Sequence, residues 1–400
     1  MIKTFDNSNF FQTLRREVLS NNSELIEKRI TNIRKNLKFK IYTKNYDAND
    51  DLLTLIIVIS DMNTNFIEES LSCATKQSLI LPEIIFINHG CNQKITNIIN
   101  RYFKNYPLAA LIRLERNIYP ILDDEKNSLI NLWNLGLFIS KGNYVYQLSP
   151  DDSISKKYTY FITSHFKSNN KCTSVMPRVL GIDENNKVNK VKSKNYKLDF
   201  NDYFTNFELI EKIFSKKDIL SPGGAVVTKT TKLIELGGFN LCSDFSQFFL
   251  NSCIGINGYS FKAKLLWRHH PNQTNKKETK LGLIRLKIYK EFFSKYGLYK
   301  KHVSNLNEDY AKKIKIFYFN FIENKIIDDF RLIYRSSNFL TTVYALREIY
   351  KEKNIKILLR CIIILFSDLI FHLYNNYYLL KKTYRFIRSN IYFFSKMSRK

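Results

Sequence analysis

Between residues 51 and 155, short apolar runs alternate with amphipathic segments at close intervals. The runs are rich in Ile, Leu and Val and have no polar face, which is typical of strands buried on both sides. The expected strands lie at 52–59, 83–88, 109–114 and 144–148, and the expected helices at 66–78, 95–103 and 128–140. Strands that alternate with helices predict a parallel, doubly wound sheet, so we expect an α/β fold.

Composition divides the rest of the chain. We expect a polar, helical N-terminal extension at 1–50 and an α/β domain at 51–275, which has halves at 51–155 and 156–275. Residues 276–400 have mostly helical patterns that are rich in Lys, Tyr and Phe.

The second half of the α/β domain has longer loops. We expect a hairpin around 175–188, a strand at 225–228 and a strand at 264–267. A helix at 231–236 should end at Gly237-Gly238, because a helix C-terminus commonly needs a left-handed residue that glycine supplies.

The strand at 144–148 runs into Ser149-Pro150-Asp151-Asp152. Adjacent carboxylates at the carboxyl end of a buried strand suit a divalent cation and, through it, a diphosphate. Ligands of open α/β sheets gather at this edge. A plain turn is the alternative, since Pro and Asp are both frequent in turns.

Charge and cysteine content narrow the class of protein. The chain has 63 Lys and Arg against 36 Asp and Glu, a net charge of +27 that favours anionic partners. Its six cysteines are scattered without a CxxC pair, which argues against a zinc site or a disulfide framework and fits a reducing cytosol. The N-terminus has no signal-peptide pattern, so we expect a cytoplasmic location.

Motifs along residues 52–275, taken in order, resemble the inverting GT-A glycosyltransferases of family 2. The matching segments are Leu53 to Ser60, Ser70 to Ser78, Glu83 to Cys91, Asn134-x-Gly136 with Ser140-x-Gly142, Ser149 to Asp152, Lys229 to Asn240 with Ser243-Asp244-Phe245, and Trp267 to Pro271. The resemblance implies a Rossmann-like GT-A domain that transfers a sugar from a nucleotide-sugar donor, in a bacterial surface polysaccharide or glycan pathway.

The resemblance also implies site residues. It implies that Asp151, Asp152 and His270 bind Mg²⁺ or Mn²⁺, and that Asp244 is the general base that deprotonates the acceptor hydroxyl. Residues implied to contact the nucleotide sugar are Ile59, Ser60, Asn88, His89, Asn134, Gly136, Asp151, Gly224 and Arg268. Structural alternatives are an N-cap for Asp244, a surface pair of histidines at His269 and His270, and a plain turn at Gly224.

Two positions depart from the family pattern. Asn88 and His89 replace the aspartates that usually contact the nucleotide, although an amide still offers a donor and an acceptor. Ser149 replaces the first metal-binding aspartate, so weaker metal binding is expected. A catalytically degenerate binding protein is therefore one alternative function. A nucleic-acid-binding protein is another, because the chain is basic and aromatic, but its basic residues are spread along the sequence.

The apolar segment at 355–380 has charged residues every few positions, so it does not predict a membrane span. An amphipathic helix in the membrane interface fits better, because a basic and aromatic tail follows it at 381–400. We expect peripheral association with the inner face of the cytoplasmic membrane and a saccharide or lipid-linked acceptor. A helical hairpin packed on the catalytic domain is the alternative.

Overall fold

The structure is a computed structural model. It describes residues 2–21, 23–47, 51–61, 65–116, 129–189, 203–204, 208, 225–239, 255–270, 327, 330, 346, 358–365 and 377–378. Most of the region predicted at 276–400 lies outside these residues.

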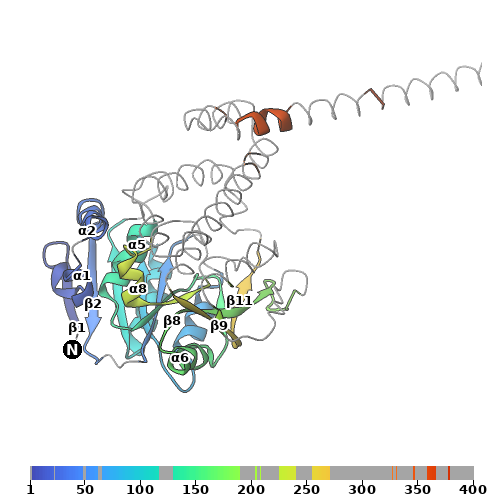
Figure 1. The fold of residues 1–400 in the computed structure, drawn as a ribbon. Coiled ribbons are helices and arrows are strands. Elements are labelled where there is room, and N and C mark those ends of the chain that lie inside the picture. Colours follow the sequence, from blue (N-terminus) through green and yellow to red (C-terminus); the bar gives the residue numbers. More distant parts are fainter. Residues whose placement is uncertain are drawn as a thin grey trace, which may run out of the picture. The chain divides into compact units, whose positions relative to one another are not determined.

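Four parallel strands form the centre of the sheet, in the order β5-β4-β3-β6. Figure 1 shows the fold as a ribbon. The four strands are β3 (Leu53–Ile59), β4 (Glu83–Asn88), β5 (Ala109–Leu114) and β6 (Tyr144–Gln147), connected through α3 (Ile67–Thr75), α4 (Gln93–Asn105) and α5 (Leu129–Ile139). These elements confirm the predicted alternation, with small differences at their ends. The order of the strands reverses between β3 and β6, which is where open α/β sheets bind ligands.

Both faces of this sheet are covered, as a doubly wound fold requires. Leu53, Leu55 and Ile57 of β3 pack in one cluster with apolar residues of α3, α4 and α6 (Tyr158–Ser168). Ile56 faces the opposite cluster, which contains residues of α2 (Glu24–Asn36), α5 and α8 (Thr230–Glu235). The alternation along β3 follows from the two-residue period of a strand.

The N-terminal 47 residues are only partly helical. The predicted helical stretch contains η1 (Phe10–Thr13), α1 (Arg16–Leu19) and α2, but two strands that we did not predict flank it. These strands, β1 (Ile2–Asp6) and β2 (Phe39–Lys44), extend the sheet antiparallel beyond β5. The segment is therefore part of the sheet as well as a helical layer on it. Alternation in β1 is hard to detect because its residues are mostly exposed.

Beyond β6 the sheet becomes mixed. β10 (Val227–Lys229) lies antiparallel between β6 and β8 (Cys172–Ile182). β11 (Ile256–Arg268) is parallel to β8 and antiparallel to the short strand β7 (Ser153–Ile154). The strand expected at 264–267 is the end of β11. The tiny strand β9 (Tyr203–Phe204) pairs with the start of β11.

The predicted hairpin at 175–188 is present as a turn. After β8, Asn186 N donates to Asp183 O at 3.2 Å, and Ile182 pairs with Val188 through an isolated antiparallel bridge. The described residues show only this bridge in the second arm.

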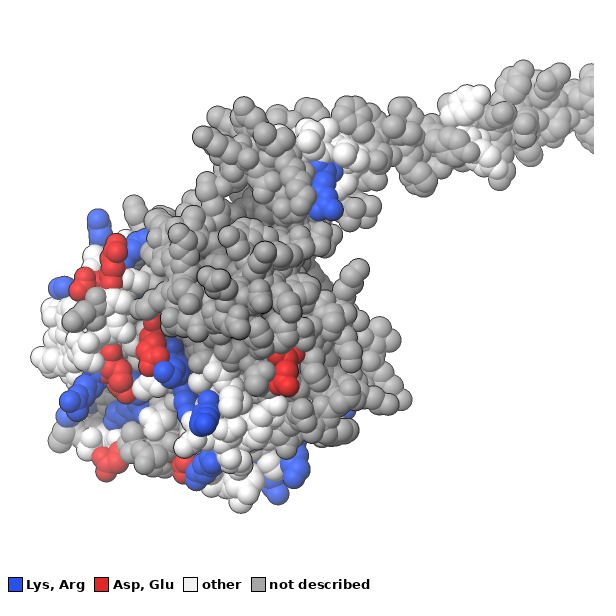
Figure 2. All heavy atoms as spheres, viewed as in Figure 1, with Lys and Arg blue, Asp and Glu red and all other residues white. Residues whose placement is uncertain are grey.

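The chain divides into two compact units, 1–319 and 320–400. In the second unit the structure describes a helical stretch at 358–365, in which Cys361 is buried while Leu359 and Ile363 are exposed. Among the described residues, no helix combines the length and the apolar character that a membrane crossing needs. Where the residues of the first unit are described, Lys and Arg intermingle with Asp and Glu on the face shown in Figure 2.

Candidate functional site

The acidic turn, defined as Ser149, Pro150, Asp151 and Asp152, follows β6 at the carboxyl edge of the sheet. Leu148 N donates to Ile56 O at 3.0 Å, which extends the pairing of β6 with β3 up to the turn. Asp152 N then donates to Ser149 O at 3.2 Å and closes it. The turn and the end of β3 therefore lie together at the point where the strand order reverses.

Arg268, at the end of β11, is completely buried beside this turn. Its backbone N–H donates to Asp152 Oδ1 at 2.9 Å. Its Nε donates to Asp151 O at 2.9 Å, and its two Nη atoms donate to Asp183 O at 3.1 Å and to Glu69 Oε1 at 2.6 Å. The guanidinium thus ties the acidic turn to the end of β8 and to α3.

These contacts give Arg268 a structural role behind the acidic turn. Its three described side-chain bonds go to acceptors of the chain, and its side chain is buried. The contact with the nucleotide sugar that we predicted for Arg268 stays a prediction.

His270 also contacts the acidic turn. Its Nε2 lies 3.1 Å from Asp151 Oδ2, and both side chains are largely buried. Because a carboxylate oxygen only accepts, Nε2 carries the proton in this contact. The ring of Phe66, next to α3, lies 5.1 Å from the His270 ring and 4.5 Å from the Arg268 guanidinium carbon. The predicted pair of Asp151 and His270 is therefore brought together.

The donor set at this point suits a cation with few protein ligands. A carboxylate oxygen and an imidazole nitrogen about 3 Å apart have the spacing of neighbouring ligands around one metal ion. Asp152 Oδ1 accepts from Arg268 N, so this oxygen already has a partner in the chain. Within the described ranges, no group of three or more His, Cys, Asp or Glu side chains could hold a metal. Asp151 and His270 fit a divalent cation that takes its remaining ligands from a diphosphate and water.

The loop after β4 uses its own polar groups. Asn88 Nδ2 donates to Thr96 Oγ1, and its Oδ1 accepts from Cys91 N, each at 2.9 Å. The adjacent His89 is fully buried, and burial lowers the pKa of its imidazole to about 4. These contacts give Asn88 a structural role, and the nucleotide contacts predicted for Asn88 and His89 stay predictions.

The end of β3 keeps its predicted place at the carboxyl edge. Ile59 O accepts from His89 N at 2.9 Å, and Ile59 itself is buried. Ser60 is half-buried directly after the strand. Both residues lie where a nucleotide contact is predicted, and that contact stays a prediction.

Asn134 and Gly136 of α5 serve packing. Asn134 Nδ2 donates to Phe239 O at 2.8 Å, and its Oδ1 accepts from Phe239 N at 2.9 Å. A Cβ on Gly136 would lie 2.8 Å from Ile56 Cγ2, so glycine lets α5 approach β3 closely. Their predicted contact with the nucleotide sugar finds no support in this geometry. Asp244 and Gly224 lie outside the described residues, so their predicted roles stay predictions.

No protein-family model matches the sequence, and no curated protein sequence matches it. Solved structures do resemble the fold. The crystal structure of S. aureus TarS 1-349 matches with a TM-score of 0.50 and 11% identity, over 76% of this chain and 82% of that chain. Its complex with UDP-GlcNAc matches with a TM-score of 0.46 and 12% identity, over 74% and 79%. Its complex with UDP matches with a TM-score of 0.43 and 13% identity, over 70% and 81%.

The first of these likenesses, together with the sheet, confirms the predicted fold class. The protein has a Rossmann-like α/β fold that resembles the fold of S. aureus TarS 1-349.

Three residues of the site escaped the sequence analysis. Glu69 and Phe66 lie in or beside α3, where a helix with two adjacent glutamates predicts an ordinary solvent-facing surface. Asp183 contributes only its backbone carbonyl, which no side-chain pattern reveals. Glu69 gave no signal either, because the arginine that it contacts lies 199 residues away in the sequence.

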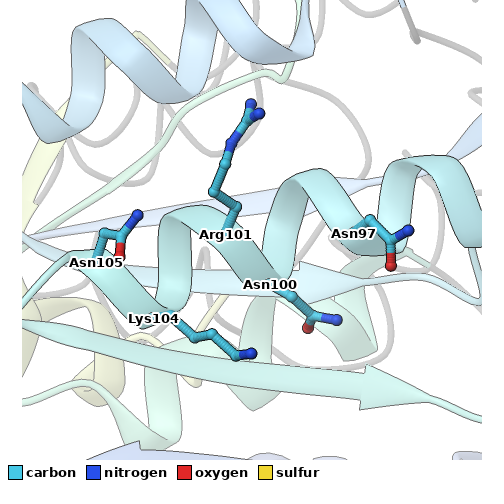
Figure 3. A pocket seen from close by; sticks show the side chains of 5 residues that line it. All are labelled: Asn97, Asn100, Arg101, Lys104 and Asn105. Atoms are coloured by element: carbon cyan, nitrogen blue, oxygen red, sulfur yellow. The ribbon is translucent and has the colours of Figure 1, made fainter.

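A separate surface depression of about 380 Å³ follows the exposed face of α4 (Figure 3). It is lined by Asn97, Asn100, Arg101, Lys104 and Asn105. Helix α4 begins at the carboxyl edge of the sheet, after β4, and leads to the start of β5 at the opposite edge. The lining residues lie in the part of α4 that approaches this opposite edge, so the depression is not part of the candidate site. One of them, Arg101, pairs with Glu68 at 2.8 Å.

Proposed function

We propose that this protein is a glycosyltransferase that moves a sugar from a nucleotide-sugar donor to a saccharide or lipid-linked acceptor. The fold supports glycosyl transfer in general. The finer proposal is an inverting reaction of the family 2 type, in bacterial surface polysaccharide or glycan biosynthesis. It rests on the motif order and on the chemistry of the acidic turn.

One observation carries the proposal. Asp151 and His270, from segments 119 residues apart, meet at the carboxyl edge where β3 and β6 diverge in strand order. A buried carboxylate–imidazole pair at a topological switch point is suited to a ligand whose diphosphate brings a metal ion.

Each residue of the candidate site has its own role in the proposed reaction. Asp151 and His270 would hold Mg²⁺ or Mn²⁺, which would stabilise the charge that develops on the departing nucleoside diphosphate. Cation binding through His270 Nε2 would displace the proton that this atom now shares with Asp151. Arg268 keeps the main chain of the acidic turn in place. Asp244, predicted from sequence, would accept the proton of the acceptor hydroxyl.

The location is proposed separately. The exposed Leu359 and Ile363 are one helical turn apart, and the basic tail at 381–400 follows them in sequence. These features support a cytoplasmic protein that binds the inner face of the cytoplasmic membrane peripherally.

A donor screen tests the function. Thermal shift and sugar release are measured with Mn²⁺ across a nucleotide-sugar panel that begins with UDP-GlcNAc, the compound present in a TarS complex. We expect one donor to stabilise the protein and to be turned over, and Asp151→Ala to abolish both effects. Glu235→Ala, which removes an exposed carboxylate paired with Lys232, is the matched control.

Two results would overturn this function. Donor binding without turnover on any acceptor or water would indicate the catalytically degenerate binding protein. Salt-sensitive binding to single-stranded nucleic acid, without any response to donors, would indicate a nucleic-acid-binding protein.

A further inference from the structure

Glu69 connects two parts of the candidate site through one oxygen atom. Its Oε1 accepts from Arg268 Nη2 at 2.6 Å and from Ser153 Oγ at 3.3 Å. Ser153 directly follows the acidic turn, and Arg268 holds the turn by donating to Asp151 O. One carboxylate on α3 therefore contacts both the residue after the turn and the side chain behind it.

The burial of the pair makes the contact consequential. The Arg268 side chain is fully buried, whereas the Glu69 side chain is 41% exposed. A buried guanidinium requires a nearby negative charge, since an uncompensated buried cation is strongly unfavourable. Charge-assisted bonds from a planar guanidinium also fix direction more sharply than neutral bonds do.

The neighbouring glutamate shows what an ordinary contact on this helix looks like. Glu68 pairs with Arg101 at 2.8 Å, but both side chains are more than half exposed. Exposed pairs of this kind contribute little to stability and impose little on distant groups. The two adjacent glutamates of α3 thus have the same chemistry and very different partners.

We propose that Glu69 is a positioning residue for the reaction: by orienting Arg268 and Ser153 it holds the acidic turn so that Asp151 faces His270. This inference rests on the proposed function for its catalytic consequence. It assigns to α3 a role that the motifs of the acidic turn and of the closing segment do not contain. Glu69 itself touches neither donor nor metal in this scheme.

Two variants and a matched control test the proposal in the full-length protein. Glu69→Ala removes the carboxylate, Glu69→Gln keeps an oxygen acceptor without the charge, and Glu68→Gln changes the adjacent exposed pair. The first readout is hydrogen–deuterium exchange of peptides that cover the acidic turn. We expect faster exchange at 149–153 in Glu69→Ala, an intermediate rate in Glu69→Gln, and the wild-type rate in Glu68→Gln.

The second readout is the Mn²⁺ dependence of donor turnover. Loss of a residue that orients metal ligands commonly reduces metal affinity or activity by about 10–100-fold. We expect Glu69→Ala to raise the half-saturating Mn²⁺ concentration or lower kcat in this range, with a smaller loss in Glu69→Gln. The KM for the donor should change less, because Glu69 does not contact it.

The outcomes separate this inference from the proposed function. Unchanged exchange at the acidic turn in Glu69→Ala overturns the inference, even if melting temperature falls. Faster exchange with wild-type Mn²⁺ dependence and kcat also overturns it, because Glu69 would then only stabilise the fold. If the wild-type protein turns over no donor, the proposed function fails, and the exchange measurement still decides whether Glu69 holds the turn.

Discussion

Asp151 and His270 are far apart in sequence and meet because β6 and β11 both end at the same edge of the sheet. The contact is buried, so exchange of either side chain for an apolar one would remove a buried polar contact of its partner. The proposed metal-assisted reaction depends on this pair.

At this scale we predict the effect of His270→Gln. Glutamine retains a polar side chain but replaces the imidazole nitrogen, a strong ligand for divalent transition metals, with an amide. We expect the Mn²⁺ concentration needed for half-maximal turnover to rise about 10-fold or more. Titration of turnover with Mn²⁺ measures this. His165→Gln in α6 is the comparison, because the described contacts of its ring are with Phe161 O and Tyr259 O and not with the acidic turn. Equal effects of both changes would contradict the prediction.

The buried imidazole of His89 should make the free energy of unfolding depend on pH. Burial lowers the pKa of its imidazole to about 4, below its ordinary value of 6.5. Between these values the unfolded chain binds a proton that the folded chain does not, so stability falls as pH falls through this window. From about pH 7 to about pH 5, this group alone should remove about 2 kcal/mol from the free energy of unfolding.

The variant His89→Gln isolates this contribution. Denaturant unfolding of wild type and variant at several pH values gives the two stability curves. We expect the difference between them to shrink as pH falls, because only the wild type has this histidine to protonate on unfolding. Parallel curves between about pH 7 and about pH 5 would show that the imidazole is not held neutral by burial.

At the scale of elements, α5 is joined to the turn after α8 by Asn134. The turn has the bonds of a Schellman motif: Gly237 N donates to Ile234 O and Gly238 N to Leu233 O, each at 2.8 Å. Gly238 has φ +82°, and a Cβ there would lie 2.1 Å from Asn134 Oδ1. The glycine therefore provides both the left-handed backbone and the room for the asparagine.

We predict that Asn134→Ala destabilises the fold without changing donor affinity. It leaves the buried N–H and C=O of Phe239 without the bonds that Asn134 supplies, at a cost of about 1–3 kcal/mol for each unsatisfied group. Chemical denaturation measures the loss, and Asn97→Ala on the exposed face of α4 is the control. A raised donor KM at unchanged stability would instead return Asn134 to its predicted role in the nucleotide site.

Asn134 and Asp151 illustrate what the sequence could predict and what it could not. The period of the apolar residues predicts β3 to β6 and the helices between them, since burial on both faces leaves a strong pattern. The motif residues mark the right places but not their tasks, because an asparagine suits a ligand and a backbone tie equally well. Glu69 and Asp183 could not be predicted, since their partners lie 199 and 85 residues away from them.

At the scale of the whole molecule, the chain has two compact units and a large positive net charge. The first unit contains the candidate site, and its described surface mixes both signs of charge on the face in Figure 2. The second unit combines exposed apolar side chains at Leu359, Ile363, Tyr377 and Tyr378 with the tail at 381–400, which contains seven Lys and Arg and no acidic residue. An anionic lipid surface is complementary to both properties.

We therefore predict that the full-length protein co-sediments with vesicles of phosphatidylcholine and phosphatidylglycerol, and far less with phosphatidylcholine alone. Basic residues near an anionic surface contribute about 1 kcal/mol each, and this contribution weakens as salt screens it. The double change Leu359→Ser and Ile363→Ser should reduce binding at all salt concentrations, because it removes apolar area and no charge. Tyr160→Ser, an exposed aromatic of α6, should have no effect. Equal binding to neutral and anionic vesicles, or full binding by the double variant, would exclude this mode of association.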